Sequence, residues 1–557
     1  MKFTLPNIPE SEQTPLVKGL LVLIENLIAE NQQLKEQVAT LKDEIQVLKK
    51  QKKRPKFKPS KLDSDTEKEL NDASSDSEAS NDDASPPEDS KKAKGADDEN
   101  KSSNRRRRAR NKQSMTIHHI HCIHPDNLPE GSRFKGYQDF IVQELVLRNE
   151  NSCYRLARWL TPDGRVLRGE LPASLENRHY GPELVSYMLY QHHHMQVTQP
   201  LLLEQLRELG IEISAGQIDR LLSDGKARFH AEKDALLEIG LAHSEFVTVD
   251  DSGARHKGKN GYVTHIGNDF FAWFSSTESK SRINFLSLLQ AGDVLYQLSE
   301  KALAYMREKK LPQPLLEALA AHSGTMFNNK EAWQSKLTAL NITNERHQRI
   351  ATEGALLGAL LQRSNLEELA IVSDGAGQFD VLQHGLCWVH AERLIHTLLP
   401  QNEAHRAAIA KVRGDVWTLY RELKCYKQNP ASEQMQRLSD QFDEVFSQKT
   451  AFATLNQCLK RLYKQKSKLL LVLERPEIPL HTNDSERDIR DYVKKRKISG
   501  GTRSELGRRC RDTFASLKKT CKKLGISFWA YLRDRHQDHE IPPLAELVRC
   551  KLAATTL

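Results

Sequence analysis

The sequence predicts a multidomain α/β protein whose N-terminal segment forms a coiled coil. Three observations support this fold class. The chain has 557 residues, which is too long for one compact core. Near the N-terminus, apolar residues recur every seven positions. Farther along, short apolar runs typical of buried strands alternate with long helical segments.

The composition indicates a protein with segregated charge. The formal net charge of +9 hides separate acidic and basic blocks, which suit a polyanion partner or simply a solvated surface. The eight cysteines are scattered without any Cys-x-x-Cys pair, as in reduced cytosolic proteins. No apolar run approaches the roughly 18 residues of a membrane span. We therefore expect a soluble, cytoplasmic protein that binds no membrane.

Residues 16–50 carry an a/d heptad repeat, and we assign 1–50 to a leucine-zipper coiled coil. Leucine fills the d positions and mostly β-branched residues fill the a positions, a pattern that favours two parallel strands. One amphipathic helix packed on its own domain is the alternative. The polar a residue and the leucines expected to drive dimerisation are Leu20, Leu27, Asn31, Leu34, Leu41 and Leu48.

Residues 51–114 are expected to form a disordered charged linker. Asp63–Asn100 is rich in Ser, Asp and Glu and has no aromatic residue, so it cannot bury enough apolar surface to offset ordering entropy. The cluster that follows suits the phosphates of a DNA backbone, although it is equally typical of a solubilising linker end. It contains Arg105, Arg106, Arg107 and Arg108.

Two small segments follow the linker. Residues 115–178 predict a β-rich module, with strands at Phe140–Leu147 and Tyr154–Leu160 and a turn at Thr161–Gly164. Its histidines and Cys122 lack the paired spacing of a zinc finger, so zinc stays doubtful. Residues 179–240 predict helices: one over Pro200–Leu209, and another that starts at the capping box Ser214–Gln217. This arrangement fits a DNA-binding helix-turn-helix or an ordinary helical hairpin.

Acidic residues follow two apolar runs that read as buried strands. Phe246–Val249 leads into Asp250, and Leu369–Ser373 leads into Asp374. We place both acids at strand ends, although Asp251 lies beside Asp250 and only the strand register separates these two. Two further strand-like runs after Asp250 form a hairpin that resembles the start of a ribonuclease-H-like fold. A third acid, Glu486, opens a strongly basic helix.

Three carboxylates from two strands and one helix can support phosphoryl transfer on DNA. Two hard cations about 4 Å apart stabilise both the attacking and the leaving oxygen, and carboxylate oxygens are their natural ligands. We therefore predict that Asp250, Asp374 and Glu486 are catalytic and bind two Mg²⁺ or Mn²⁺ ions. Each acid also has an ordinary alternative. The two aspartates could cap turns, and Glu486 could be the third residue of a capped helix that starts at Asn483.

Two blocks of the sequence resemble a known family. Pro479–Leu506 and the Ser373-Asp374-Gly375 block followed by Cys387-Trp388-Val389-His390 are similar to DDE transposases of the bacterial insertion-sequence family sixty-six. The resemblance spans about residues 130–540. It implies that Asp250, Asp374 and Glu486 are metal-binding catalytic acids in a ribonuclease-H-like core. It also implies a structural role for Cys387 and His390. The family's upstream zinc cysteines are not reproduced here.

The resemblance also implies the remaining domains and partners. Residues 241–390 would hold the first part of the core, 391–475 a helical insertion, and 476–557 the helix with the third acid and the C-terminal helices. The expected partners are double-stranded DNA at element ends and target, a second copy through the zipper or a higher oligomer, and accessory proteins of the same element. Nucleoid association would follow from DNA binding.

The helix beyond Glu486 carries basic residues every three or four positions, so they share one face. These residues, predicted to bind DNA phosphates, are Arg487, Arg490, Lys494 and Lys497. Lys495 and Arg496 are expected to widen the surface. A solvated helix face is the alternative. At the level of the whole protein, the alternatives to an active transposase are an inactive or domesticated DNA-binding derivative and a coiled-coil scaffold without a DNA role.

Overall fold

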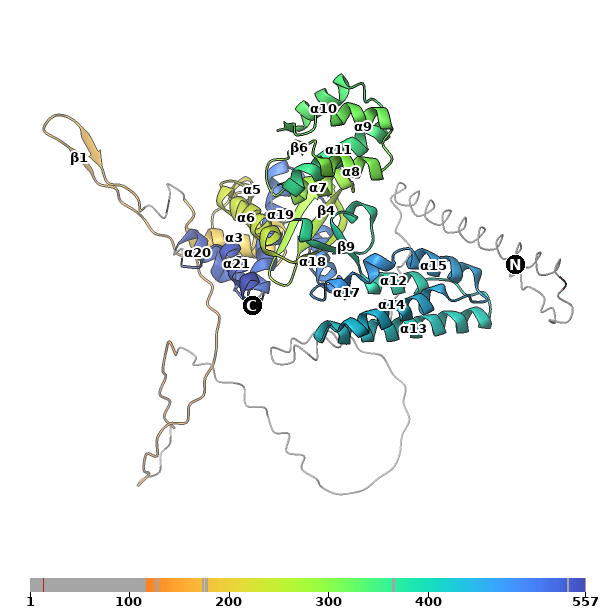
Figure 1. Cartoon of the computed structure of the whole chain (residues 1–557). Helices are drawn as coiled ribbons and strands as arrows, with labels where there is room; N and C mark the ends of the chain where they lie inside the picture. The colour runs from red at the N-terminus through yellow and green to blue at the C-terminus, as the bar shows by residue number, and fades with distance from the viewer. Residues whose placement is uncertain are drawn as a thin grey trace, which may run out of the picture. The chain divides into compact units, whose positions relative to one another are not determined.

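The computed structural model describes Thr14 and residues 117–555, apart from 126, 128, 130, 173–174, 176–178, 363–365 and 538–539. The predicted zipper, the linker and the Arg105–Arg108 cluster lie outside the described residues. The chain divides into two compact units, Asn71–Arg148 and Asn149–Leu557 together with Met1–Leu70. All elements below belong to the second unit and are drawn in Figure 1.

The predicted β-rich module forms less sheet than expected. A single hairpin pairs β1 (Arg158–Leu160) with β2 (Val166–Arg168) in antiparallel register. Its turn is the predicted one, because Gly164 N donates to Thr161 O at 2.9 Å. The expected strand Phe140–Leu147 does not form. Its side chains contact no second apolar layer, and Phe140 is 90% exposed, so nothing offsets the entropy of ordering a strand.

The helices predicted after residue 179 are present. They are α3 (Pro182–Leu189), the π-helical turn Tyr190–His194, α4 (Gln199–Glu208), α5 (Ala215–Ser223) and α6 (Ala227–His243). The capping box is confirmed: the Ser214 side chain accepts from Gln217 N, and the Gln217 side chain accepts from Ser214 N at 2.9 Å. Six residues join α4 to α5, with Gly210 at φ +76° in the left-handed region.

A mixed five-stranded sheet lies at the centre of the second unit. Its strands are β3 (Phe246–His256), β4 (Lys259–Gly267), β5 (Ala272–Thr277), β8 (Ala370–Ser373) and β9 (Gln383–Leu386). The strand order is β5-β4-β3-β8-β9. The first three strands are antiparallel to one another, whereas β8 runs parallel to both β3 and β9.

The strand before Asp250 is longer than predicted. We expected Asp250 to follow the end of the strand, but β3 continues for six more residues, to His256. The reason is non-local, since β4 pairs with β3 out to His256↔Lys259. The parallel ladder with β8 nevertheless stops at Thr248↔Val372. Asp250 therefore lies just beyond the end of the parallel part of the sheet, although not beyond the end of its own strand.

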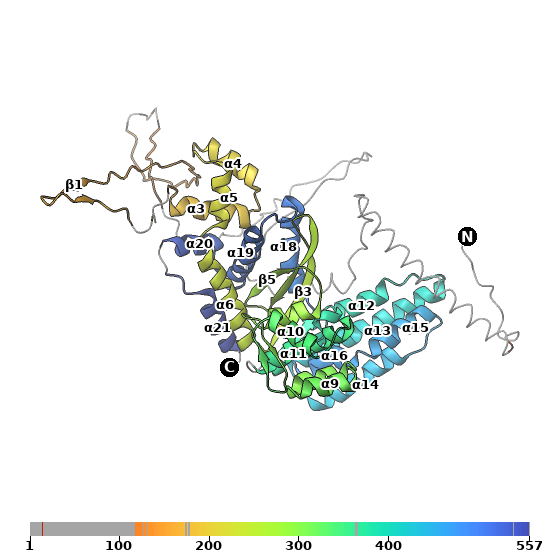
Figure 2. The ribbon, with the colours of Figure 1, turned by 90° about the horizontal axis from the view of Figure 1, so that it is seen from above.

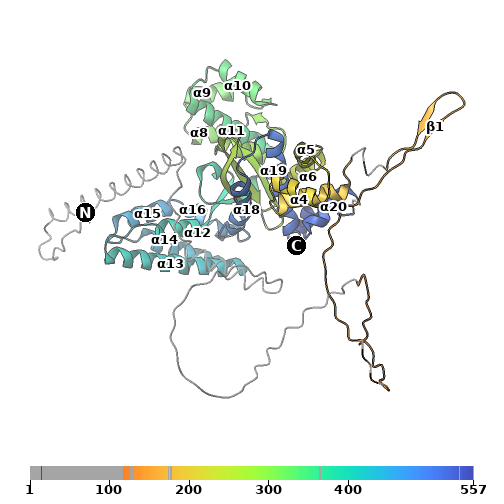
Figure 3. The same ribbon diagram turned by 180° about the vertical axis from the view of Figure 1, so that it is seen from behind.

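Two helical insertions interrupt the sheet. The first, between β5 and β8, contains α7 (Arg282–Leu289), β6 (Tyr296–Gln297), α8 (Glu300–Glu308), α9 (Gln313–Ala320), β7 (Met326–Phe327), α10 (Lys330–Ala339) and α11 (Glu345–Gln362). The second follows β9 and contains α12 (Trp388–His396), α13 (Glu403–Gln428), α14 (Ser432–Ser447), α15 (Ala453–Tyr463), α16 (Lys466–Leu469) and α17 (Leu471–Glu474). In Figures 1 and 3, α12–α15 lie side by side as a bundle. Its apolar core continues into the sheet through Ala370 and Val372 of β8.

The C-terminal helices are α18 (Asn483–Ser499), α19 (Glu505–Lys523), α20 (Phe528–His536) and α21 (Leu544–Thr555). Helix α18 packs against β3 and β4, and α19 follows the free edge of β5, as Figure 2 shows. Buried side chains between α18 and the sheet include Val263, Phe274, Ile489 and Tyr492. Within the described part of the chain, no helix combines the length and the apolar character needed to cross a membrane.

Side chains of α19 bond the outward backbone groups of the edge strand β5. Asp512 Oδ2 accepts from Ser276 N at 2.8 Å, and Ser516 Oγ accepts from Phe274 N at 2.9 Å. Thr520 Oγ1 accepts from Ala272 N at 3.2 Å. Four residues of helix rise by about 6.0 Å and two residues of strand by about 6.8 Å, so the two ladders stay in step. Side chains of helix α19 thus supply the hydrogen-bond acceptors that the backbone of a sixth strand would supply.

Candidate active site

The sheet register brings Asp250 and Asp374 to the same edge. Thr248 pairs with Val372 in the last step of the parallel β3–β8 ladder. Two residues farther along each chain lie Asp250 and Asp374. Because neighbouring strands are about 4.8 Å apart, the backbones at these two positions are close neighbours. Parallel pairing alone therefore accounts for the meeting of two acids 124 positions apart in sequence.

The direction of the side chains separates Asp250 from Asp251. Residues two apart on a strand point to the same face, so Asp250 faces the same side as Thr248. The Thr248 hydroxyl accepts from Ser485 Oγ on α18 at 2.5 Å, which puts Asp250 on the α18 face. Asp251 points to the other face, where it pairs with Lys280 and accepts from Gln378 Nε2 at 2.7 Å. The register thus singles out Asp250 as the acid facing α18.

Glu486 lies in the first turn of α18 and does not cap that helix. The N-cap is Thr482, one residue earlier than the alternative required, and its side chain makes no capping hydrogen bond. Glu486 Oε1 instead lies 3.3 Å from His390 Nε2. Asp374 does make the turn contact expected of an ordinary aspartate, because its Oδ1 accepts from Ala376 N at 2.9 Å.

The Cys387–His390 block ties together the segments that carry Asp374 and Glu486. Cys387 is the N-cap of α12, and its backbone N donates to Ser373 O at 2.9 Å, directly before Asp374. Trp388 N donates to Leu480 O at 2.9 Å, shortly before α18 begins. The buried Trp388 ring also donates from Nε1 to Leu469 O. The predicted structural role of this block is consistent with these contacts.

Cys387 and His390 lie side by side next to Glu486, and each shifts the pKa of the other. Burial acts against both charges, but the contact between the two side chains outweighs it. This contact lowers the pKa of the Cys387 thiol. Burial would lower the pKa of His390, yet Cys387 and the Glu486 carboxylate together raise the pKa of His390 to about 9.

Asp250 lies in the field of the other two acids. Burial in the sheet is the main cause that raises the pKa of Asp250 to about 7, and the carboxylates of Asp374 and Glu486 raise it further. A hydrogen bond from Asp251 N at 2.7 Å acts in the opposite direction. This mutual repulsion places the three acids in one electrostatic cluster, which a bound cation would stabilise.

The three acids do not form a closed metal cage. No group of three or more His, Cys, Asp or Glu side chains among the residues that the structure describes is arranged to hold a metal ion. The reason lies in their partners, since Asp250 and Asp374 bond backbone N–H groups while Glu486 faces His390. Glu486 Oε1 is nevertheless buried and makes no hydrogen bond with the described residues, as expected of an oxygen that binds a cation. The donor set fits hard divalent ions.

The predicted basic face of α18 is exposed. Arg487, Arg490, Lys494 and Lys497 all lie on the solvent side of the helix. Two of them make only loose pairs within the helix, at 3.6 Å to Asp484 and 3.8 Å to Asp491. Lys495, which we expected to widen this surface, is instead 8% exposed and donates to His192 O at 2.6 Å. It lies on a different side of the helix, about 100° from Lys494 around the axis.

The loop after α18 is held against β3 by backbone hydrogen bonds. Thr502 N donates to Arg255 O at 2.9 Å, and Lys257 N donates to Thr502 O at 2.8 Å. A Cβ on Gly501 would lie 2.5 Å from Arg255 O, so only glycine permits this close approach.

A cluster of cations surrounds the buried face of α18. It contains Lys495, Arg503, Arg511 and Lys518. Of these, only Lys495 was singled out from the sequence, as part of the exposed basic surface. The doublets Lys518-Lys519 and Lys522-Lys523, four residues apart on that helix, were the available signal.

Comparisons with known proteins cover the segment that contains the second and third of the predicted acids. The family model described as "Transposase IS66 family" matches residues 325–509, which include Asp374, Cys387, His390 and Glu486. The chain is also similar to a protein of Sinorhizobium fredii (strain NBRC 101917 / NGR234) named uncharacterized protein y4jO. The two are 42% identical over 320 residues, which cover 57% of this chain and 100% of that relative.

Proposed function

This chain belongs to the IS66 transposase family, and from that premise we propose that it cleaves and rejoins DNA with Asp250, Asp374 and Glu486 as metal-binding catalytic acids. The observation that carries the proposal is the raised pKa of Asp250, caused by burial and by the two other carboxylates. Three acids from separate segments come close enough to repel one another. Such an arrangement costs stability and is typical of a cation-binding catalytic site.

The sheet supports a ribonuclease-H-like core for this site. Its order β5-β4-β3-β8-β9, with three antiparallel strands followed by two parallel ones, is the order that we expect of that fold. The first acid comes from the central strand and the second follows its parallel neighbour. The third acid comes from a helix on the same face.

We assign each part of the site a role in cleavage and strand transfer. Bound Mg²⁺ or Mn²⁺ would supply Lewis-acid stabilisation of the attacking and leaving oxygens. Asp250, Asp374 and Glu486 would hold two such ions. His390 would orient Glu486 through the 3.3 Å contact between His390 Nε2 and Glu486 Oε1. Arg487, Arg490, Lys494 and Lys497 hold phosphates of double-stranded DNA on the exposed face of α18.

The remaining proposals concern recognition and assembly. Helices α4 and α5 form a short helical pair that fits recognition of the element's terminal inverted repeats. The heptad segment, which lies outside the described residues, would join two or more copies. Accessory proteins of the same element and association with the nucleoid fit this activity.

The test uses the neighbouring acids Asp250 and Asp251 as a matched pair. Purified protein is incubated with labelled element-end DNA, a target plasmid and Mg²⁺ or Mn²⁺, and strand-transfer products are separated on a gel. We expect Asp250→Asn, Asp374→Asn and Glu486→Gln each to lose more than about 100-fold in rate, because even an outer partner of a metal ligand is typically worth 10–100-fold. Chelation with EDTA should abolish the products.

Asp251→Asn is the control, since Asp251 pairs with Lys280 on the other face of the sheet. It should retain most of the activity. Equal loss in Asp250→Asn and Asp251→Asn, or products that persist in Asp374→Asn, would refute the assignment. Salt-sensitive DNA binding without any product would favour the inactive, DNA-binding derivative. If the protein binds no DNA at all, the result would favour the coiled-coil scaffold without a DNA role.

A further inference from the structure

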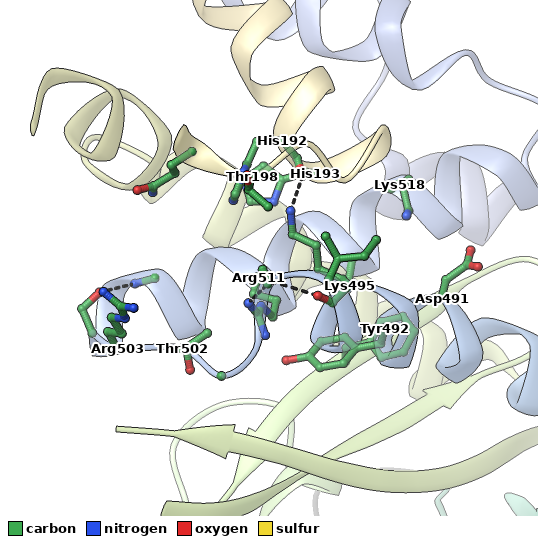
Figure 4. A pocket seen from close by; sticks show the side chains of 18 of the residues that line it. His192, His193, Thr198, Asp491, Tyr492, Lys495, Thr502, Arg503, Arg511 and Lys518 are labelled. Atoms are coloured by element: carbon green, nitrogen blue, oxygen red, sulfur yellow. Dashed lines mark hydrogen bonds between the residues drawn. The ribbon is translucent and has the colours of Figure 1, made fainter. Parts of the chain in front are cut away.

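A polar pocket of about 530 Å³ opens between the helical pair and the C-terminal helices (Figure 4). Its size falls within the range of small-molecule sites, roughly 300–1,000 Å³. The π-helical turn Tyr190–His194 and the start of α4 form one wall, and α18, α19 and the loop between them form the other. The α18 residues that line the pocket are not those of the exposed basic face.

The pocket wall carries more positive than negative charge. Five cationic side chains line it, against three carboxylates. Two of these carboxylates are already paired, because Asp488 and Asp491 both bond Lys519. The third, Asp219, accepts from Gln199 Nε2 at 2.9 Å. The other cations of the pocket have none of its carboxylates within salt-bridge distance. They are Lys495, Arg503, Arg511 and Lys518.

Lys518 is the cation best placed to bind a ligand. Lys495 is committed to His192 O, and Arg511 donates to Ser499 Oγ at 2.9 Å. Lys518 makes no hydrogen bond or salt bridge with any residue that the structure describes, yet it is only partly exposed. The charge of Lys518 affects the pKa of Lys495. Burial is the main cause that lowers the pKa of Lys495 to about 7, and the charges of Arg511 and Lys518 lower it further. Burial lowers the pKa of Lys518, and the nearby charges of Asp491 and Asp488 oppose that shift without bonding the lysine directly.

Two helix N-termini add to this field. Thr198, Gln199 and Pro200 at the start of α4 line the pocket, as do Ser504 and Gly507 at the start of α19. The α4 N-terminus has no side-chain cap, so the N–H groups of Gln199 and Leu201 have no capping acceptor, whereas Pro200 has no N–H. At the start of α19, the Gly507 N–H already donates to Ser504 Oγ. N-terminal N–H groups and the helix dipole favour a negatively charged group.

We propose that this pocket binds a backbone phosphate of the DNA, with Lys518 as the principal contact and Arg503 at the rim. The inference rests on the proposed DNA binding and adds a second contact surface, separate from Arg487, Arg490, Lys494 and Lys497. The pocket links the helical pair to α18, which also carries Glu486. Lys495 lies nine residues after Glu486, about 13.5 Å along the helix axis. That distance equals roughly four base-pair rises of duplex DNA.

The test measures how DNA affinity depends on salt. For the full-length protein on duplex DNA, each lost phosphate contact should reduce the slope of log K against log salt concentration by about 0.9. We expect this decrease in Lys518→Gln, and in Arg503→Gln as a second variant whose side chain is exposed. The loss should be the same for unrelated duplex sequences, since a phosphate carries no sequence information. Thermal unfolding of Lys518→Gln should match that of the wild type, because no bond is removed.

Lys522→Gln is the matched control. Lys522 lies one turn farther along α19, is exposed, and does not line the pocket. Its slope should equal that of the wild type. An unchanged slope in Lys518→Gln, or an equal decrease in Lys522→Gln, would overturn the proposal. If the wild type still binds DNA and transfers strands in that experiment, only the pocket assignment fails.

A second arm separates a DNA phosphate from a free one. Inorganic phosphate is titrated against the wild type and Lys518→Gln, and duplexes with a single neutral methylphosphonate are compared at successive positions. We expect one position whose neutralisation weakens the wild type but not Lys518→Gln. The absence of such a position, with Lys518-dependent binding of inorganic phosphate, would make the ligand a free phosphate and overturn the proposal.

Discussion

The Ser516→Ala substitution should loosen the edge of the central sheet. The Ser516 hydroxyl accepts from Phe274 N at 2.9 Å, and both residues are at most 1% exposed. Alanine leaves this N–H buried without an acceptor, which costs about 1–3 kcal/mol. The neighbouring acceptors on α19 are already occupied, because Asp512 and Thr520 accept from the next outward N–H groups of β5.

Native-state hydrogen exchange measures this effect directly. A loss of about 1–3 kcal/mol in the free energy of local opening accelerates exchange of the β5 amides roughly 5- to 150-fold. Peptides that cover Ala272–Thr277, analysed by mass spectrometry, report it. Thr338→Val serves as the control, because that exposed hydroxyl bonds only its own helix, at Gln334 O. Unchanged protection of β5 in Ser516→Ala would refute the view that α19 stabilises this edge through side-chain acceptors.

Two further predictions concern pH. Burial is the main cause that lowers the pKa of Lys495 to about 7 in the folded protein, whereas the pKa of an unfolded lysine is about 10.4. The free energy of unfolding of the wild type should therefore increase as pH rises from about 7 to 10. Lys495→Met should lose this rise and be more stable at pH 7, as thermal unfolding would show; an identical pH profile would contradict the cause given. Burial would raise the pKa of Glu232, but hydrogen bonds from Arg535, Leu544 N and Tyr531 lower it. Glu232 therefore stabilises the fold at pH values above the pKa of an unfolded glutamate, about 4.3. Glu232→Gln should be less stable at pH 7, and the difference should narrow as pH falls below about 4; a constant difference would argue against an ionic origin.

The sequence predicted best those features that short-range chemistry determines. The capping box at Ser214, the strand before Asp374 and the exposed face with Arg487 and Arg490 each follow from residues within about ten positions. Periodicity alone specifies such features. The classification of the chain as multidomain α/β follows from the same local patterns.

Features that depend on distant partners were predicted poorly. The true end of β3 depends on β4, and the burial of Lys495 depends on a π-helical turn some 300 residues earlier. Phe140–Leu147 has the residues of a strand but no neighbour to pair with. The choice between Asp250 and Asp251 required the register against α18, which no local pattern contains.

The position of the second helical insertion has a consequence for how the protein is made. Glu486 follows Asp374 by 112 residues, and most of them belong to α12–α17. At roughly 5–20 residues per second, translation of that interval takes on the order of 6–22 s. During this time a nascent chain holds two of the acids but not the third. A truncated or unfinished product would therefore lack one of the three acids that we propose to be catalytic.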